Sequence, residues 1–233
     1  NSDRDSRGDV WTVRSAGNAE FHGEDGWLHV DVPGAHWLAG LDMPGAEPAL
    51  APMFLVAPPP DAATVSCDTR LRFESGARAP NASAAGLALV RRDQGASLLL
   101  QANREANQLR FEWWQEKGLA GGGGPRAFGS SEDIWLRFEH LGSHFAVSRK
   151  DREQDEWEDV TALMTDTLSN IAHRFPAGEF LVGLFVTSGL TPDDDGRVAF
   201  DYFNSPQITA LDVEAAGTAA VVWGAVKRGA ATN

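Results

Sequence analysis

Short stretches of alternating apolar and polar residues, separated by turn signals, constrain the fold of this chain more than any other feature. The turns are rich in Gly, Pro and Asp, as at 24–26, 58–61 and 193–196. The pattern predicts strands at 26–32, 53–57, 63–73, 86–92, 96–102, 108–114, 134–140, 143–148, 180–186 and 197–203. Many short strands of this kind predict an all-β protein in which two antiparallel sheets form a sandwich.

Helical patterning is scarce by comparison. Apolar residues recur at helical spacing only between 159 and 173, which predicts at most one short helix there. The glycine run 121–124, followed by Pro125, predicts a loop. It lacks the Lys-Ser/Thr pair of a phosphate-binding loop, so we expect no nucleotide there.

The charge balance restricts the possible partners. The formal net charge is −13 and the sequence pI is about 4.8. Binding to a nucleic acid backbone needs clustered Lys and Arg, so no nucleic acid partner is expected. The longest apolar run, 180–186, has the length of a buried strand, whereas a membrane helix needs about 20 apolar residues. We therefore expect no membrane insertion.

The termini and the single cysteine suggest a domain organisation. Residues 1–8 are polar and carry no visible signal peptide, which is typical of a mature start and predicts a disordered segment. We expect the sandwich over 9–213 and a tail or final strand, with Trp223, over 214–233. Cys67 excludes an intramolecular disulfide, and its strand-like surroundings predict a buried structural thiol.

Two predicted strands carry aromatic and charged residues on the face opposite their apolar row. In 108–114 these residues are Arg110, Glu112 and Trp114. In 134–140 they include Trp135 and Arg137. Sugars present apolar C–H faces ringed by hydroxyl groups, so an indole flanked by Arg and Glu suits them physically. The alternative is that these indoles are packed beneath a loop or the tail.

Trp37, in the loop-like stretch 34–38, is a further candidate for sugar stacking. Together with the five residues of the two strands, it makes up the predicted ligand-binding set: Trp37, Arg110, Glu112, Trp114, Trp135 and Arg137.

Several motifs resemble a known superfamily. The segment 134–148 is similar to the WLRxExxGxxFxxxxS hairpin of concanavalin A-like domains, and Trp157 falls where that hairpin continues to a DGxxW motif. Residues 180–188 and 198–203 resemble the VGLFxxS and FDxF strands that follow. The chain thus resembles the concanavalin A-like lectin/glucanase superfamily, including the C-terminal β-sandwich domain of family-43 β-xylosidases and related stand-alone bacterial domains. The resemblance implies a jelly-roll sandwich and leaves the function open.

The favoured function is extracellular, non-catalytic recognition of a polysaccharide through a Trp- and Arg-bearing sheet face or groove, in a secreted or cell-surface protein. One alternative is a glycoside hydrolase or polysaccharide lyase acting in the same groove. Glu153, Asp155 and Glu158 fit the ExDxxE pattern of laminarinase-like glucanases, in which one strand supplies nucleophile and acid. A lyase with a tyrosine base would have to use Tyr202, the one tyrosine. A second alternative is a partner-binding module that docks through the Trp223 tail.

Carboxylates near the predicted last strand suggest a cation. Asp193, Asp195 and Asp201 offer the oxygen ligands that Ca²⁺ takes, so a structural calcium ion is a candidate, with a solvated acidic turn as the alternative. No organic cofactor is expected. The glycan, its linkage and the oligomeric state stay open at this stage.

Overall fold

The computed structural model describes most of the predicted sandwich. The described residues are 11–14, 19–34, 36–37, 49–50, 52–74, 84–93, 96–103, 108–115, 118–127, 132–164, 171–188 and 195–208. The predicted N-terminal segment 1–8 and the tail 214–233 with Trp223 lie outside the described residues, so the domain boundaries remain predictions.

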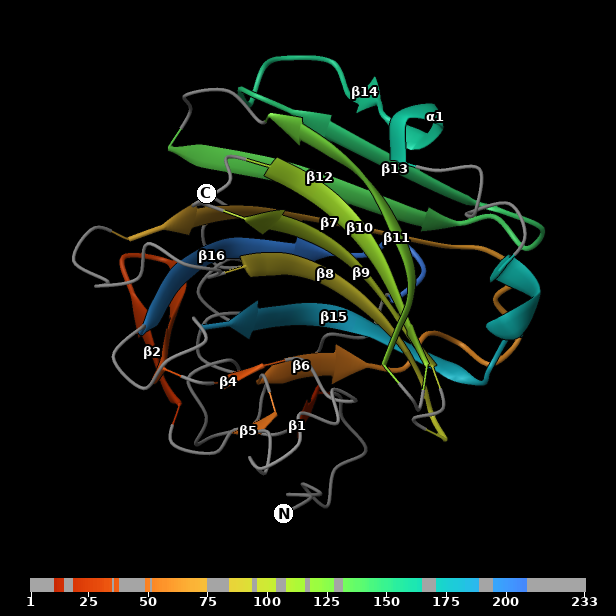
Figure 1. Cartoon of the computed structure of the whole chain (residues 1–233), viewed down its shortest axis with the longest axis horizontal. Coiled ribbons are helices and arrows are strands. Elements are labelled where there is room, and N and C mark those ends of the chain that lie inside the picture. The colour runs from red at the N-terminus through yellow and green to blue at the C-terminus, as the bar shows by residue number, and fades with distance from the viewer. Residues whose placement is uncertain are drawn as a thin grey trace.

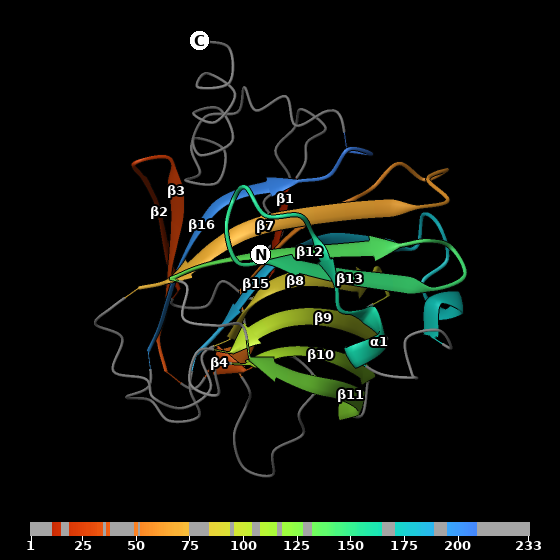
Figure 2. The ribbon, with the colours of Figure 1, turned by 90° about the horizontal axis from the view of Figure 1, so that it is seen from above.

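Two seven-stranded antiparallel sheets make up most of the described residues, and Figure 2 shows them as two layers. Sheet A has the order β1-β6-β15-β8-β9-β10-β11. Its strands are β1 Trp11–Arg14, β6 Met53–Val56, β8 Ala84–Arg91, β9 Ala96–Asn103, β10 Gln108–Gln115, β11 Gly118–Ala127 and β15 Phe180–Thr187. Sheet B has the order β14-β13-β12-β7-β16-β3-β2 (Figure 1). Its strands are β2 Glu20–Glu24, β3 Trp27–Val32, β7 Val65–Phe73, β12 Asp133–His140, β13 Phe145–Lys150, β14 Glu158–Asp159 and β16 Gly196–Asn204.

The remaining elements are short. β4 (His36–Trp37) and β5 (Ala49–Leu50) form a small parallel pair. The helix α1 spans Thr161–Met164, and a 3₁₀ turn, η1, spans Ala172–Arg174. The all-β class and the short helix near 159–173 are therefore confirmed.

The core lies between the two sheets because each strand turns its apolar row inward. Leu71 of β7 and Leu136 of β12 are fully buried in sheet B, and Leu109 of β10 is fully buried in sheet A. Phe111 and Phe138 meet across the layers with ring centroids 6.4 Å apart. This is the alternation that the sequence predicted for β7, β10 and β12. Cys67 belongs to the same core, and burial raises the pKa of its thiol.

The outer faces of the two sheets differ in chemistry. On strands β6, β8, β9 and β15 of sheet A, apolar residues that face away from the main core are buried as a second cluster. Its members are Met53, Leu55, Ala88, Val90, Leu99, Leu181 and Phe185. Strands β8 and β15 are consequently buried on both faces, which explains their continuous apolar runs. The outward residues of sheet B are largely polar and charged, so the candidate site is sought there.

The glycine run 121–124 is a strand and not the loop predicted from the sequence. It belongs to β11, where Gly121, Gly122 and Gly123 lie opposite Trp113, Glu112 and Phe111 of β10. Two register shifts interrupt the pairing. β11 is the last strand of sheet A, and an edge strand tolerates both Pro125 and bulges. Composition favoured a loop because glycine carries no strand signal of its own.

No helix in the described part of the chain is long and apolar enough to span a membrane.

Candidate binding face on sheet B

The outer face of sheet B is built from aligned cross-strand rows. In the central row, Tyr202 of β16 lies opposite Arg70 of β7, which lies opposite Trp135 of β12. Trp135 in turn lies opposite Lys150 of β13. Side chains directly opposite each other in neighbouring strands share one face and are in contact distance. The row therefore places an indole between two cations.

Two further rows flank the central one. On one side Arg72 of β7 lies opposite Asp133 of β12. On the other side Asn204 of β16 lies opposite Asp68 of β7, and Asp68 lies opposite Arg137 of β12. Cations and carboxylates thus alternate across the strands, an arrangement that stabilises a sheet face exposed to water.

Trp27, at the start of β3, extends this arrangement. The guanidinium carbon of Arg70 lies 4.9 Å from the centroid of the Trp27 ring and 5.0 Å from that of Trp135. The guanidinium carbon of Arg72 also lies 4.9 Å from the Trp27 centroid. Arginine over an indole face is a favourable cation–π contact. One cation therefore joins two indoles that come from different strands.

Trp157, between β13 and β14, lies at the opposite end of this arrangement from Trp27. The guanidinium carbon of Arg137 lies 4.1 Å from its ring centroid, and Lys150 Nζ lies 5.2 Å from it. Lys150 Nζ also lies 5.9 Å from the Trp135 centroid. We call the residues joined in this way the cation–indole network. Its members are Trp27, Arg70, Arg72, Trp135, Arg137, Lys150 and Trp157.

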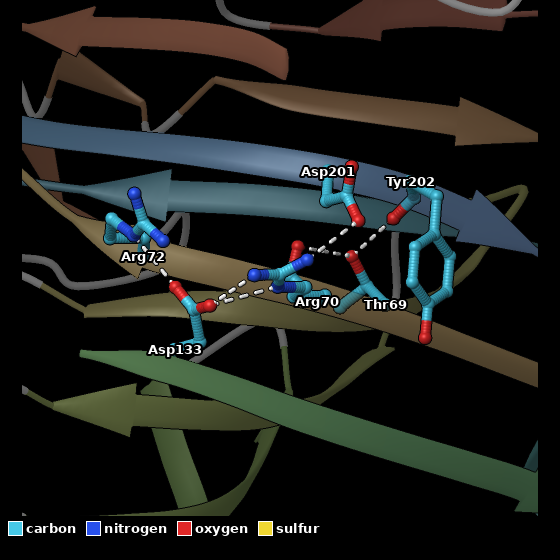
Figure 3. A network of polar contacts seen from close by, with 6 residues as sticks. All are labelled: Thr69, Arg70, Arg72, Asp133, Asp201 and Tyr202. Carbon is cyan, nitrogen blue, oxygen red and sulfur yellow. Dashed lines mark hydrogen bonds and ion pairs between the residues drawn. The ribbon is translucent and has the colours of Figure 1, made fainter. Parts of the chain in front are cut away.

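Asp133 holds two of these cations in place (Figure 3). Its Oδ1 accepts from Arg72 Nε at 2.6 Å, and its Oδ2 accepts from Nε of Arg70 at 3.0 Å and from Nη2 of the same residue. Burial alone would raise the pKa of Asp133, but the hydrogen bonds from Arg72 and Arg70 outweigh burial and hold it below its usual value. The hydrogen bond to Asp133 raises the pKa of Arg72. Both guanidinium planes are thereby fixed against the indoles.

A bulge in β16 brings a second carboxylate to Arg70. The register shifts between Phe200 and Tyr202, so Tyr202 lies opposite Arg70 although Phe200 faces the core. Asp201 then places Oδ2 3.3 Å from Arg70 Nη1. The Thr69 hydroxyl donates to the Tyr202 carbonyl at 2.5 Å and satisfies a backbone acceptor at the bulge (Figure 3).

Asp68 organises the third row. Its Oδ2 accepts from Asn204 Nδ2 at 3.1 Å and lies 3.5 Å from Arg137 Nη2. Burial raises the pKa of the Tyr202 phenol, and the neighbouring Asp68 charge and hydrogen bond raise it further. A phenol with a raised pKa stays protonated near neutral pH, so Tyr202 can donate a hydrogen bond on this face.

The indoles differ in exposure. Trp135 is 5% exposed and is covered within the network, so it offers no open stacking surface. Trp27 and Trp157 are both partly exposed. Trp135, which the sequence analysis singled out, lies within the network, whereas the two partly exposed indoles, Trp27 and Trp157, lie at its ends. The sequence did carry a signal for this face, because Arg70 and Arg72 form a polar row in the predicted strand 63–73.

The predicted ligand-binding residues do not all share one face. Trp135 and Arg137 lie together on β12 of sheet B. Arg110 and Glu112 lie on β10 of sheet A, with Arg110 Nη1 3.8 Å from Glu112 Oε1. The core separates the outward faces of the two sheets, so these pairs cannot contact one ligand surface. The side chains of Trp114 and Trp37 lie outside the described part of the structure.

The acidic residues predicted for catalysis lie at one end of sheet B. Glu153 and Asp155 are exposed in the turn after β13, and Glu158 is on β14. Glu158 Oε2 accepts from Arg149 Nε at 2.9 Å. Retaining hydrolysis needs two carboxyl groups about 5–5.5 Å apart across a substrate. The structure does not bring these three residues onto a common strand where that spacing would arise.

The carboxylates predicted for calcium are also separated. Asp195 is exposed before β16 and accepts a hydrogen bond from the Gly34 amide at 3.1 Å. Asp201 lies six residues further along, roughly 20 Å of extended chain, and pairs with Arg70. Asp193 lies outside the described residues. Within the described ranges no group of three or more His, Cys, Asp or Glu side chains could hold a metal ion. Because Asp193 is one of the three predicted ligands, the calcium site stays a prediction.

A search of solved structures shows which known proteins share this architecture. A protein of unknown function from Saccharomyces cerevisiae aligns over 84% of this chain and 95% of its own, with a TM-score of 0.58 and 14% identity. The GH43 protein BlXynB from Bacillus licheniformis aligns over 84% of this chain with a TM-score of 0.53 and 15% identity. The exoplasmic/lumenal domain of VIP36, in its Ca²⁺/Man2-bound form, aligns over 86% with a TM-score of 0.51 and 10% identity.

The chain has the concanavalin A-like fold. The superfamily resemblance seen in the sequence is thus confirmed at the level of architecture. The chain spans 34% of BlXynB, so it corresponds to only part of that protein. A scan against protein-family models finds no match, and a search of curated proteins finds no similar sequence.

Proposed function

We propose that this protein recognises carbohydrate, without cleaving it, through the outer face of sheet B. The observation that carries the proposal is the cation–indole network, in which Trp27 and Trp157 are partly exposed at opposite ends of a row of hydrogen-bonding side chains.

The chemistry of the face suits a sugar. An indole plane packs against the apolar C–H face of a pyranose, while charged and polar groups beside it satisfy the hydroxyl groups. Arg72 is well placed for the second role because its side chain is 41% exposed and only its Nε is engaged by Asp133 in a hydrogen bond. Arg137 lies at the same time against Trp157 and near Asp68.

The indoles are also preorganised. Each is held by at least one cation that is itself fixed by a carboxylate or, for Lys150, by the Glu153 carbonyl at 2.6 Å. Binding to such a face requires little loss of side-chain freedom, which favours affinity for a ligand that makes few contacts.

The shared fold supports the proposal by analogy, since the VIP36 domain of the same architecture is described in a Ca²⁺/Man2-bound form. A polysaccharide would be met outside the cell, so we propose a secreted or cell-surface location. The non-catalytic character is supported by Glu153 and Asp155, which are exposed in a turn.

Native affinity electrophoresis tests the proposal. The purified chain is run through gels that contain plant, algal or microbial polysaccharides, alongside the variants Trp157→Ala and Arg110→Ala. We expect at least one polymer to retard the wild type and to remain intact. Trp157→Ala should lose most of the retardation, corresponding to at least about tenfold weaker binding.

Arg110→Ala is the matched control, because Arg110 is an exposed cation on the outer side of sheet A. It should be retarded as strongly as the wild type. Retardation that depends on Arg110 and not on Trp157 would refute the assignment to sheet B. Absence of retardation in every gel would refute carbohydrate recognition, and a shortened polymer would indicate an enzyme.

A further inference from the structure

We infer that the sheet B face binds the interior of an extended, uncharged polysaccharide chain that crosses the strands from Trp27 to Trp157. This inference rests on the proposed function and names the class of saccharide that the same face would take. It follows from the spacing of the indoles and from the charges around them.

The three indoles come from different segments of the face, and the cations that they share set upper limits on their separations. Because Arg70 is 4.9 Å from the Trp27 centroid and 5.0 Å from that of Trp135, these centroids are at most about 10 Å apart. Lys150 limits the distance between the Trp135 and Trp157 centroids in the same way, because its Nζ lies 5.9 Å from the first centroid and 5.2 Å from the second. Trp27 begins β3, and Trp157 lies between β13 and β14 with its ring centroid 4.1 Å from the Arg137 guanidinium carbon. Strands β3 and β13 are four positions apart in sheet B.

Neighbouring strands lie about 4.8 Å apart, so the backbones of β3 and β13 are roughly 19 Å apart across the sheet. Trp135, between the two ends, is only 5% exposed. A single sugar ring can stack on one end indole at a time, whereas a chain that lies across the strands reaches both. The residues between the ends, Arg70, Arg72 and Asp133, supply polar contacts along that path (Figure 3).

The charge distribution disfavours an acidic chain. Arg70 is paired with Asp133 and Asp201, Arg72 with Asp133, and Arg137 with Asp68. These cations are therefore neutralised by the protein itself. The exposed turn beside Trp157 carries further carboxylates, namely Asp151, Glu153, Asp155 and Glu156. A polyanion approaching a chain with a net charge of −13 would be repelled at this end of the face.

The experiment uses isothermal titration calorimetry with named probes. Arabinoxylan, mixed-linkage β-glucan and galactomannan are the uncharged polymers, and polygalacturonate and alginate are the acidic ones. An oligosaccharide series from disaccharide to hexasaccharide is then prepared from the uncharged polymer that binds. The hexasaccharide should bind at least about tenfold more tightly than the disaccharide. Borohydride reduction of its end should leave its affinity unchanged.

Two variants test whether Trp27 and Trp157 form the two ends of the binding face. Trp27→Ala and Trp157→Ala should each weaken binding of the hexasaccharide about tenfold, and the double variant should abolish it. Near-ultraviolet circular dichroism and thermal unfolding of each variant show whether the fold is kept. If one alanine variant does not fold, the corresponding phenylalanine variant, which keeps an aromatic ring of smaller area, takes its place and should bind with intermediate affinity.

The outcomes separate the inference from the proposed function. Equal affinity for disaccharide and hexasaccharide, or loss of binding on reduction of the end, would overturn the inference and leave carbohydrate recognition intact. Binding to polygalacturonate or alginate that added NaCl abolishes would also overturn it. Absence of binding to all five polymers would refute the proposed function itself.

Discussion

The guanidinium carbon of Arg137 lies 4.1 Å from the ring centroid of Trp157, although the two residues come from β12 and from the segment between β13 and β14. The contact ties the connection that follows β13 to the face of the sheet. Arg137 Nη2 in turn lies 3.5 Å from Asp68 Oδ2, so the cation that contacts Trp157 is itself paired with a carboxylate of β7. The stability of this connection should therefore depend on both partners.

A double-mutant cycle measures that dependence. Arg137→Met and Trp157→Leu, alone and combined, should give a coupling free energy of about 0.5–2 kcal/mol in urea unfolding. The control cycle pairs Trp157→Leu with Arg110→Ala on the other sheet, where coupling should stay below about 0.5 kcal/mol. A coupling energy near zero for Arg137 and Trp157 would mean that the contact does not order the face.

Asp133→Asn tests the carboxylate shared by Arg70 and Arg72. Its side chain is 13% exposed, and we expect the loss of two charge-assisted hydrogen-bond partners to cost about 2–3 kcal/mol of unfolding free energy. The folded-state pKa lies below the ordinary value of 3.8, so the unfolded chain binds the proton more readily. The contribution of ionised Asp133 to the free energy of unfolding is complete well above pH 3.8, and it is lost as the pH falls through the folded-state pKa.

The variant should accordingly lose less stability than the wild type on acidification below about pH 4. Chemical unfolding at several pH values provides the measurement. Parallel pH profiles for the two proteins would show that Asp133 carries no ion-pair stabilisation.

His140 should make the fold sensitive to mild acid. It ends β12, is 3% exposed, and packs against Phe145 and Phe180 with ring centroids 5.0 and 5.2 Å apart. Burial lowers the pKa of His140 below its ordinary value of 6.5. Because the unfolded chain then binds the proton more readily, stability should decline as the pH falls below about 6.5, by at most about 1.4 kcal/mol per unit.

His140→Phe should flatten the pH dependence in this range, whereas His144→Gln, at an exposed neighbour, should leave it as in the wild type. Thermal unfolding of both variants is measured between pH 5 and 8, because this range is centred near the ordinary pKa of histidine. An unchanged slope in His140→Phe would assign the acid sensitivity to another group.

Gly183 allows β15 to approach β6 closely. A Cβ atom at this position would lie 1.8 Å from the carbonyl oxygen of Phe54, which belongs to the backbone and cannot move aside. We expect Gly183→Ala to cost more than about 4 kcal/mol and to prevent folding. Its cross-strand neighbour Ala88 provides the control, because Ala88→Gly should cost only about 1–2 kcal/mol. Normal thermal unfolding of Gly183→Ala would contradict the close approach.

The sequence predicted the layers of this fold because they follow from local alternation. Leu71, Leu136 and Phe111 lie in the core and Arg70 faces outward, as period-two patterning requires. The pattern could not assign strands to sheets, since that depends on pairings between distant segments. Arg110 and Arg137 were therefore expected on one surface, although β10 and β12 belong to different sheets.

The candidate site was predictable only in part. Trp135 and Arg137 were placed on the correct face by alternation within β12. Trp157 reaches that face from a connection, where no periodicity applies, and the β16 bulge turns Tyr202 outward against simple alternation. A single inserted residue in a strand leaves no clear trace in composition, so only the paired register shows it.

The central claim is that the outer face of sheet B contacts saccharide through Trp27 and Trp157. The most direct measurement is a two-dimensional ¹H–¹⁵N spectrum of the eight indole N–H groups, assigned by single Trp→Phe variants. The spectrum is recorded with and without a hexasaccharide of the polymer that retards the protein in gels. The account predicts that the Trp27 and Trp157 signals shift while that of Trp113, on β10 of sheet A, stays in place. A shift confined to Trp113 or Trp114, with Trp27 and Trp157 unchanged, would contradict it.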